Sequence, residues 1–176
     1  MTQLDPKVAR ELMRTGALTI DRDQLVNLLR QGGLAFNGFR NDFPETEIDL
    51  SGADLTGLQL GQVFFVGANL AGANLSGASL RDGWLNGADF TNARFDGADL
   101  TDATFGVKDL IDFEIINSPL GKRIMYGADL NGAVFTDAVL LRTSFRECNL
   151  TNVDFCGCDV STLDLRHASL DDALTD

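Results

Sequence analysis

The side chains that could carry out chemistry are few in this sequence, and their spacing argues against an active site. The single histidine, His167, lies near the end of the chain and has no predicted base partner. Cys156 and Cys158 are separated by one residue, so one thiol is expected to point inward and the other outward, which does not suit a metal pair. No G-x-x-x-x-G-K-[ST] phosphate-binding motif occurs. We therefore expect no catalytic, cofactor-binding or metal-binding residues, and we predict that the protein is not an enzyme.

Aspartates are numerous, but their positions follow a rule that has nothing to do with acid–base catalysis. Asp54 precedes Leu55, Asp99 precedes Leu100, and the same arrangement recurs along most of the chain. Paired carboxylates therefore reflect a repeat, and their pairing carries no information about general acid–base chemistry.

The repeat has a period of five residues. Every fifth residue from Leu50 to Leu170 is apolar, and a second, mostly small set lies two residues before these positions, as in Ala53, Ala98 and Ala133. A period of five fits neither a helix nor an ordinary strand. The large positions include the following predicted core residues: Leu55, Leu70, Leu75, Phe90, Phe95, Leu100, Phe105, Leu130, Phe135, Phe145 and Phe155.

One large inward side chain in every five residues is what a chain needs to turn a right angle after each unit. Four units then close a square coil of twenty residues, and successive coils stack at about the strand spacing of 4.8 Å. Backbone groups pair between coils, while columns of Leu and Phe fill the interior. The pattern predicts an all-β solenoid of about six coils over residues 48–172.

Several units carry the motif of a known family. Ser51-Gly52-Ala53-Asp54-Leu55, Ala71-Gly72-Ala73-Asn74-Leu75 and Tyr126-Gly127-Ala128-Asp129-Leu130 resemble the A-(D/N)-L-x-x pattern of the pentapeptide repeat family. The resemblance implies a right-handed quadrilateral β-helix. Some members, the fluoroquinolone-resistance proteins, are acidic dimers that imitate duplex DNA and bind DNA gyrase, whereas many others are thought to act through protein contacts.

Residues 1–47 lie outside the repeat and are predicted to form an N-terminal helical capping segment of two short helices. Asp5-Pro6 opens the first helix, which carries Val8, Leu12 and Met13 at helical spacing and ends at Gly16. The second begins near Asp21 or Asp23 and ends at Gly32-Gly33. Phe36, Phe39, Phe43 and Ile48 then lead into the first coil and close its open end. Residues 173–176 are predicted to be a C-terminal tail.

Residues 106–127 disturb the repeat. The small positions there become Lys108, Phe113, Ser118 and Arg123, and a buried unpaired charge would be costly. The length of this stretch preserves the phase of the five-residue repeat. The stretch is therefore either a distorted coil, which the preserved phase slightly favours, or a looped-out insertion. Insertions in repeat proteins often carry the binding surface.

Outward apolar residues next to this stretch form the candidate partner surface. Phe64 and Trp84 lie one coil apart on one face, and Ile124 and Tyr126 flank Met125 on the same side. Lys122 and Arg123 add positive charge to an acidic body. The alternative is that the helices or the disturbed stretch cover these side chains.

Charge and composition restrict the environment and the partners. The net charge is −12, and residues 1–44 hold six basic and five acidic side chains, so the acidity belongs to the repeats. Direct nucleic-acid binding is disfavoured. Three cysteines, Cys148 included, predict reduced thiols. With no signal-like start and no apolar run near the roughly 20 residues of a membrane span, we expect a cytoplasmic protein without membrane contact.

These observations lead to three functional hypotheses. The first is a non-catalytic protein-interaction module that presents rigid β-helix faces to an unidentified protein partner. The second is an acidic mimic of DNA that binds gyrase or another DNA-binding protein, because the charge along the rod approaches that of duplex DNA. The third is a structural or stress-related role. We also predict a homodimer that forms through the C-terminal coil.

Overall fold

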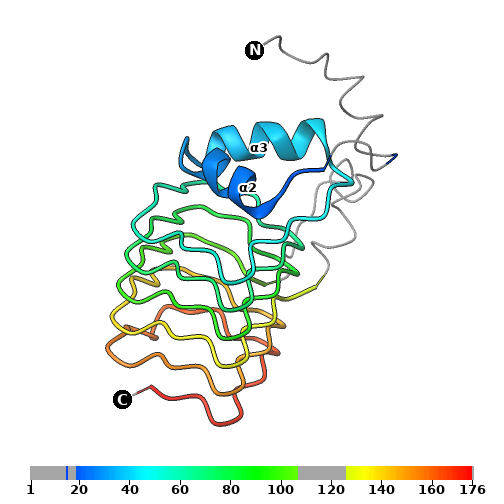
Figure 1. The fold of residues 1–176 in the computed structure, drawn as a ribbon. Helices are drawn as coiled ribbons and strands as arrows, with labels where there is room; N and C mark the ends of the chain where they lie inside the picture. The colour runs from blue at the N-terminus through cyan, green and yellow to red at the C-terminus, as the bar shows by residue number, and fades with distance from the viewer. Residues whose placement is uncertain (1–14, 16–18, 107–125, 176) are drawn as a thin grey trace.

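The computed structural model of this chain describes Thr15, residues 19–106 and residues 126–175. Two helices, α2 (Arg22–Leu29) and α3 (Gly33–Asp42), lie across one end of a stack of coils, and the C-terminus lies at the other end (Figure 1). The helices and the stack are therefore arranged end to end, with the helices as a lid on the first coil.

The coils are held together by parallel bridges between residues twenty apart in the sequence. Asp49 pairs with Asn69, Asp54 with Asn74, and the pattern repeats in four columns around the coil. Each bridge involves a single residue on each side, and the described residues contain no longer strand. The reason is geometric, because a two-residue turn in every five residues leaves room for only one paired residue before the next corner.

A local backbone hydrogen bond makes the corners, and at many of them an Asp or Asn side chain adds a second one. At one corner, the Ala103 N–H donates to the Leu100 carbonyl at 2.9 Å, which closes a tight turn. The Asp99 carboxylate accepts the Thr101 N–H at 3.0 Å, an Asx turn, and the second turn residue, Asp102, has φ +60°. Where a repeat has Asp or Asn at this position, that residue is thus a turn residue, which explains its frequency without any catalytic role.

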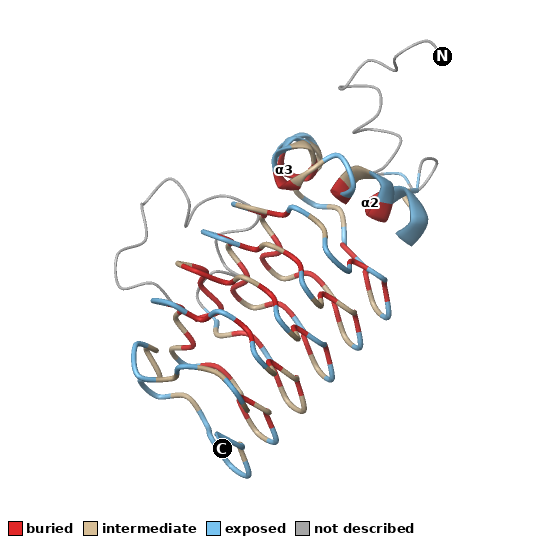
Figure 2. Ribbon diagram, turned by 90° about the vertical axis from the view of Figure 1, so that its left-hand side faces the viewer, coloured by how far each residue is buried: buried red, intermediate tan, exposed pale blue. Residues whose placement is uncertain are grey.

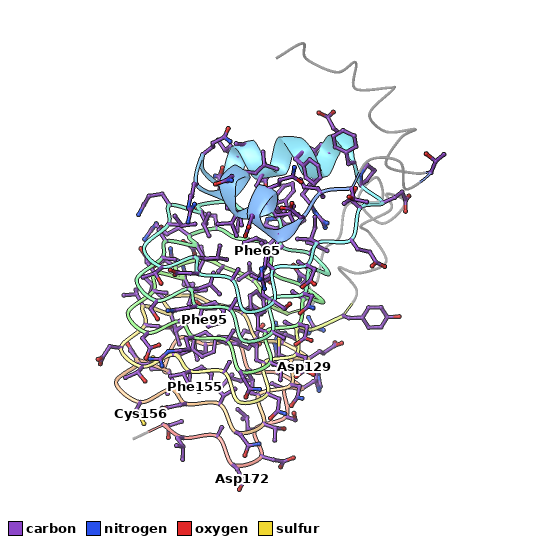
Figure 3. All side chains as sticks on the ribbon, viewed as in Figure 1. Phe65, Phe95, Asp129, Phe155, Cys156 and Asp172 are labelled. Carbon is purple, nitrogen blue, oxygen red and sulfur yellow. The ribbon has the colours of Figure 1, made fainter. Side chains whose placement is uncertain are left out.

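The large repeat positions fill the interior. The predicted core residues are all buried, with exposed fractions of 0–1%: Leu55, Leu70, Leu75, Phe90, Phe95, Leu100, Phe105, Leu130, Phe135, Phe145 and Phe155. Buried segments line the inside of the coils and exposed segments lie at the corners (Figure 2). Phe65, Phe95 and Phe155 follow one another down the stack (Figure 3).

The stack continues across the interval that the structure does not describe. Asp89 pairs with Asp129, and Phe95 stacks on Phe135 with ring centroids 4.6 Å apart, so partners here are forty residues apart. The Ala128 N–H donates to the Phe105 carbonyl at 3.0 Å, which is the turn bond of an ordinary corner. The coil before the interval and the coil after it are therefore consecutive in the stack, as a looped-out insertion requires.

Helix α2 is fixed by its own sequence and by the first coil. Asp21 and Gln24 form a capping box, and Leu25, Val26 and Leu29 are buried. Arg22 also donates from Nη1 to the Ser51 carbonyl at 2.7 Å. The helix thus buries one face on the coils and ties its first turn to a corner.

Helix α3 completes hydrogen bonds that a preceding coil would make. The Asn37 side chain accepts the Phe64 N–H at 2.8 Å and donates to the Gln62 carbonyl at 2.7 Å. Buried Arg40 donates to the Val66 carbonyl at 2.7 Å, and the Phe36 ring meets Phe65 edge-on at 5.5 Å. This helix therefore closes both the polar edge and the apolar interior of the first coil.

Two features differ from the sequence-based expectations. A helix, α3, spans Gly33–Asp42, where we predicted only a lead into the first coil; Phe36, Asn37 and Arg40 place one buried face on the stack. Pairing also extends beyond residue 172, because Leu174 bridges to Asp154 where we predicted a tail. The predicted first helix lies outside the described residues. None of the helices in the described part of the chain is long and apolar enough to cross a membrane.

Removal of residues 107–126 is expected to leave the fold intact, because Gly106 would then join Gly127 within a corner whose turn bond already exists. The free energy of unfolding and the urea m-value, measured by circular dichroism, should match those of the full chain.

The matched control is removal of residues 71–90, which also keeps the phase but deletes a regular coil. That variant should show a measurably smaller m-value than the full chain, because it lacks one regular coil and therefore exposes less surface on unfolding. Equal losses in the two deletion variants would contradict the consecutive stacking described above.

Candidate functional site: the insertion corner

The insertion corner consists of Phe105, Gly106, Gly127 and Ala128, where the interval leaves and rejoins the stack. A side chain on Gly106 would collide with the backbone of Arg146, and one on Gly127 would collide with that of Glu147 and Cys148. Both ends of the interval therefore rest on the same corner of the next coil, and only glycine fits at either end.

Buried polar side chains hold this corner in place. Asn86 is fully buried and donates from Nδ2 to the Gly106 carbonyl. Thr104, also buried, donates from Oγ1 to the same carbonyl at 3.2 Å. At the position equivalent to Asn86, Thr56 and Arg81 are exposed, whereas Thr101 is buried. At the insertion corner, two buried side chains thus donate to one backbone carbonyl.

The predicted aromatic surface is adjacent. Phe64 and Trp84 occupy successive positions of the bridge column that continues to Thr104, and their rings lie 5.6 Å apart at 43°. Both are half-buried. Tyr126, the last residue before the corner, is 68% exposed. Lys122, Arg123 and Ile124 lie outside the described residues.

The structure exposes a further apolar pair that the sequence analysis did not select. Val139 is 51% and Leu141 44% exposed, on either side of buried Leu140. The sequence contains the signal, since both residues occupy outward positions that elsewhere hold Asp, Ser, Thr or Arg. This pair lies one corner away from the column of Phe64 and Trp84.

Ion pairs distribute the charge unevenly among the faces. Every arginine of the described repeats lies within 4.0 Å of a carboxylate: Arg81 with Asp99, Arg94 with Asp96, Arg142 with Asp102, Arg146 with Glu147, and Arg166 with Asp164.

The strongest of these pairs shift the carboxyl groups they contain. Arg142 binds Asp102 through two hydrogen bonds of 2.6 Å, which lower the pKa of that carboxyl. Hydrogen bonds from Arg166 lower the pKa of Asp164 to about 2. These shifts have a structural cause and identify no catalytic acid.

One face of the described repeats carries acids and amides without arginine. Its bridge column reads Asp49, Asn69, Asp89, Asp129, Asn149 and Ser169. The Asn69 amide donates to Asp49 at 3.1 Å and the Asn149 amide to Asp129 at 2.9 Å, so amides between carboxylates relieve part of the repulsion. Asp129, within this column, lies at the side of the stack (Figure 3).

The repeat pattern matches a family model. The model of pentapeptide repeats matches in eight copies over residues 48–83, 85–106 and 124–161, more than half of the chain. The chain belongs to the pentapeptide repeat family. No curated protein sequence shows significant similarity to it.

The chain is similar to solved structures of other pentapeptide repeat proteins. Rfr23 from the cyanobacterium Cyanothece 51142 is 20% identical with a TM-score of 0.60, over 81% of this chain and 95% of Rfr23. HetL of Nostoc sp. strain PCC 7120, described as involved in heterocyst differentiation regulation, is 25% identical with a TM-score of 0.48, over 74% of this chain and 63% of HetL. The plasmid-mediated fluoroquinolone resistance protein QnrB1 is 20% identical with a TM-score of 0.40, over 65% of this chain and 57% of QnrB1. The family match and the likeness to Rfr23 together support a right-handed β-helix as the fold of this pentapeptide repeat protein.

The thiols and the histidine are not gathered into a reactive site. His167 is exposed at a corner with φ +61°. Among the described residues, no group of three or more His, Cys, Asp or Glu side chains could hold a metal ion. Burial raises the pKa of the Cys148 thiol to about 12 and also raises that of Cys158. Both thiols are therefore poor nucleophiles at neutral pH.

Alkylation with iodoacetamide at pH 8 is expected to spare Cys148 in the folded protein, because the reagent attacks thiolates and this thiol is buried and protonated. Peptide mass spectrometry should find Cys156, which is half-buried, modified well before Cys148. In guanidinium chloride all three cysteines should react alike. Equal rates for Cys148 and Cys156 in the folded state would contradict the burial described here.

Proposed function

We propose that this pentapeptide repeat protein is a non-catalytic protein-interaction module whose recognition surface is centred on the insertion corner. The observation that carries the proposal is the turn bond between Ala128 and Phe105, which closes the coil without residues 107–126. The stack does not need those residues for its own pairing. Their sequence is therefore free to serve another role, and in repeat proteins that role is most often contact with a partner.

The side chains around the corner support contact with a protein. Tyr126 is largely exposed, and tyrosine provides a large contact area at a small cost in conformational entropy. The ring pair of Phe64 and Trp84 extends the apolar part of this surface. Lys122, Arg123 and Ile124, which belong to the interval, complete the proposed surface by their sequence.

The coils supply the rigid support that such a surface needs. We infer a four-sided stack of about six coils, because the column from Asp49 to Ser169 has one member in each coil. Stacked rings such as Phe105 on Phe145, 4.9 Å apart, stiffen the interior below the corner. A partner would therefore meet a preformed surface. Free cysteines also fit the reducing cytoplasm in which we place the protein.

The pattern of charge supports a protein partner over imitation of DNA. A DNA mimic requires acids along the positions of the phosphates, whereas this stack places arginines such as Arg81, Arg94 and Arg142 among its acids on three sides. The remaining acidic face favours a partner with a basic surface. A purely structural role leaves the exposed aromatic ring of Tyr126 unexplained.

We also propose that a second copy covers the C-terminal coil. Leu170 is 46% and Leu174 58% exposed, and Leu163 and Leu165 are only half-buried. A second copy has the same spacing between coils and the same apolar positions. Its C-terminal coil is therefore complementary to this one in both respects.

Photo-crosslinking tests the recognition surface. Benzoylphenylalanine in place of Tyr126, introduced into cells of the source organism, should give one protein adduct of defined mass. The same residue in place of Leu34, which is 70% exposed on α3, serves as the matched control and should give no such adduct. Removal of residues 107–121 should weaken the Tyr126 adduct at least tenfold. The same adducts at both positions, or none at Tyr126, would refute the proposed surface.

Light scattering after gel filtration tests the homodimer. The protein at micromolar concentration should elute with twice the chain mass of 19.0 kDa. Leu170→Asp should shift it to the monomer, because a charge would be buried between the two coils, whereas Leu34→Asp should not. A wild-type monomer at high micromolar concentration would rule the dimer out while leaving the insertion-corner proposal untouched.

A further inference from the structure

The stack opens on one face, between its last two coils. On the neighbouring faces the Phe135 N–H donates to the Asp154 carbonyl at 2.7 Å, and the Phe145 N–H donates to the Asp164 carbonyl at 2.9 Å. Leu140 is the equivalent position between them, and its N–H has no hydrogen-bond partner in the part of the chain that the structure describes. The face that Leu140 occupies is therefore not paired with the last coil.

The missing hydrogen bond belongs to a missing bridge. The bridge column of this face consists of Gln59, Ser79, Asp99 and Val139. No bridge joins Val139 to Asp159 within the described residues, and the Ala138 carbonyl, which such a bridge would use, accepts no hydrogen bond there. At the next corner the Arg142 N–H meets the Thr162 hydroxyl at 3.4 Å instead of a backbone carbonyl. One acceptor and one donor, two residues apart on the same edge, are thus open.

The opposite edge of the same segment is fully paired with the preceding coil. The Val139 N–H donates to the Ala98 carbonyl at 2.8 Å, and the Val139 carbonyl accepts the Leu100 N–H at 2.8 Å. The Asp102 N–H donates to the Leu141 carbonyl at 3.0 Å. The open edge therefore belongs to a segment whose backbone is already held in place.

The side chains along the open edge are apolar, and the nearest carboxylates are not neutralised. Val139 is 51% and Leu141 44% exposed. Asp137 and Asp159 are exposed beside them, and neither forms an ion pair with another described residue. The carboxylates of the preceding coil on this face are bound by arginines. The edge is therefore complementary to a segment that combines apolar side chains with positive charge.

The open backbone groups favour an extended occupant over a helical one. Leu140 is only 2% exposed, and a buried N–H without a partner is costly. A helix satisfies its own backbone groups and would leave this N–H unpaired. An extended segment supplies both a carbonyl and an N–H, as in the addition of a strand to the edge of a sheet.

We propose that an extended segment of a basic protein partner binds to this edge by strand addition. An N–H of the segment donates to the Ala138 carbonyl, and one of its carbonyls accepts the Leu140 N–H. A β-branched or aromatic side chain of the segment packs beside Val139, and a lysine or arginine lies near Asp159. The proposal does not depend on the insertion corner, because no residue of that corner takes part.

Selection from random seven-residue peptides displayed on phage tests the proposal on the full chain. The enriched peptides should alternate apolar and polar residues and carry a lysine or arginine. By fluorescence anisotropy, Val139→Lys should weaken the binding of synthetic copies at least tenfold, because it removes the apolar contact and adds a like charge. Val134→Lys is the matched control and should leave binding unchanged, since Val134 has complete bridges to both Arg94 and Asp154.

N-methylated peptides test the mode of binding. Of two adjacent N–H groups at the centre of the peptide, methylation of one should weaken binding at least tenfold and methylation of the other should not, because successive N–H groups of a strand point in opposite directions. Enrichment of no peptide, equal binding to the Val139→Lys and Val134→Lys variants, or insensitivity to N-methylation would overturn the proposal. Light scattering should give Val139→Lys the same mass as the wild type. A lower mass would show that a second copy covers this edge, and would also overturn the proposal.

Discussion

The structure depends on one local arrangement, the tight corner made every five residues. Its backbone turn bond, and at many corners an additional Asx bond, is satisfied within a few residues, so the corners are defined by their own local sequence. Bridges between coils then need only one paired residue per side. The coils consequently form from local interactions, and stacking makes them stable. No single coil could bury enough apolar surface to offset the conformational entropy lost when it becomes ordered.

The period of five residues was sufficient to predict the coil, the core columns and the role of the outward aspartates as part of the repeat. The repeat period could not predict α3. Gly32 and Gly33 indicated the end of a helix, whereas in the structure Gly33 packs closely on the backbone of Leu60 and Gly61. The helical spacing of Phe36, Phe39 and Phe43 was the available signal.

The candidate site was only partly visible in the sequence. Trp84 and Phe64 could be placed on one face from the period alone, and the structure brings their rings together. The phase of the repeat could not distinguish a distorted coil from a looped-out insertion at 106–127, because both preserve the five-residue period. That distinction needed the pairing of Asp89 with Asp129, which no local pattern encodes.

The close approach of Phe105 and Ala128 has a consequence for how the molecule is connected. Residues 19–106 and 126–175 meet through bridges in all four columns and through stacked rings, and every residue of these contacts belongs to one of the two described parts. The two parts are therefore candidates for a split protein, in which separately made halves reassemble at this layer. The covalent link determines how often the two halves encounter each other, whereas the paired layer determines how they bind.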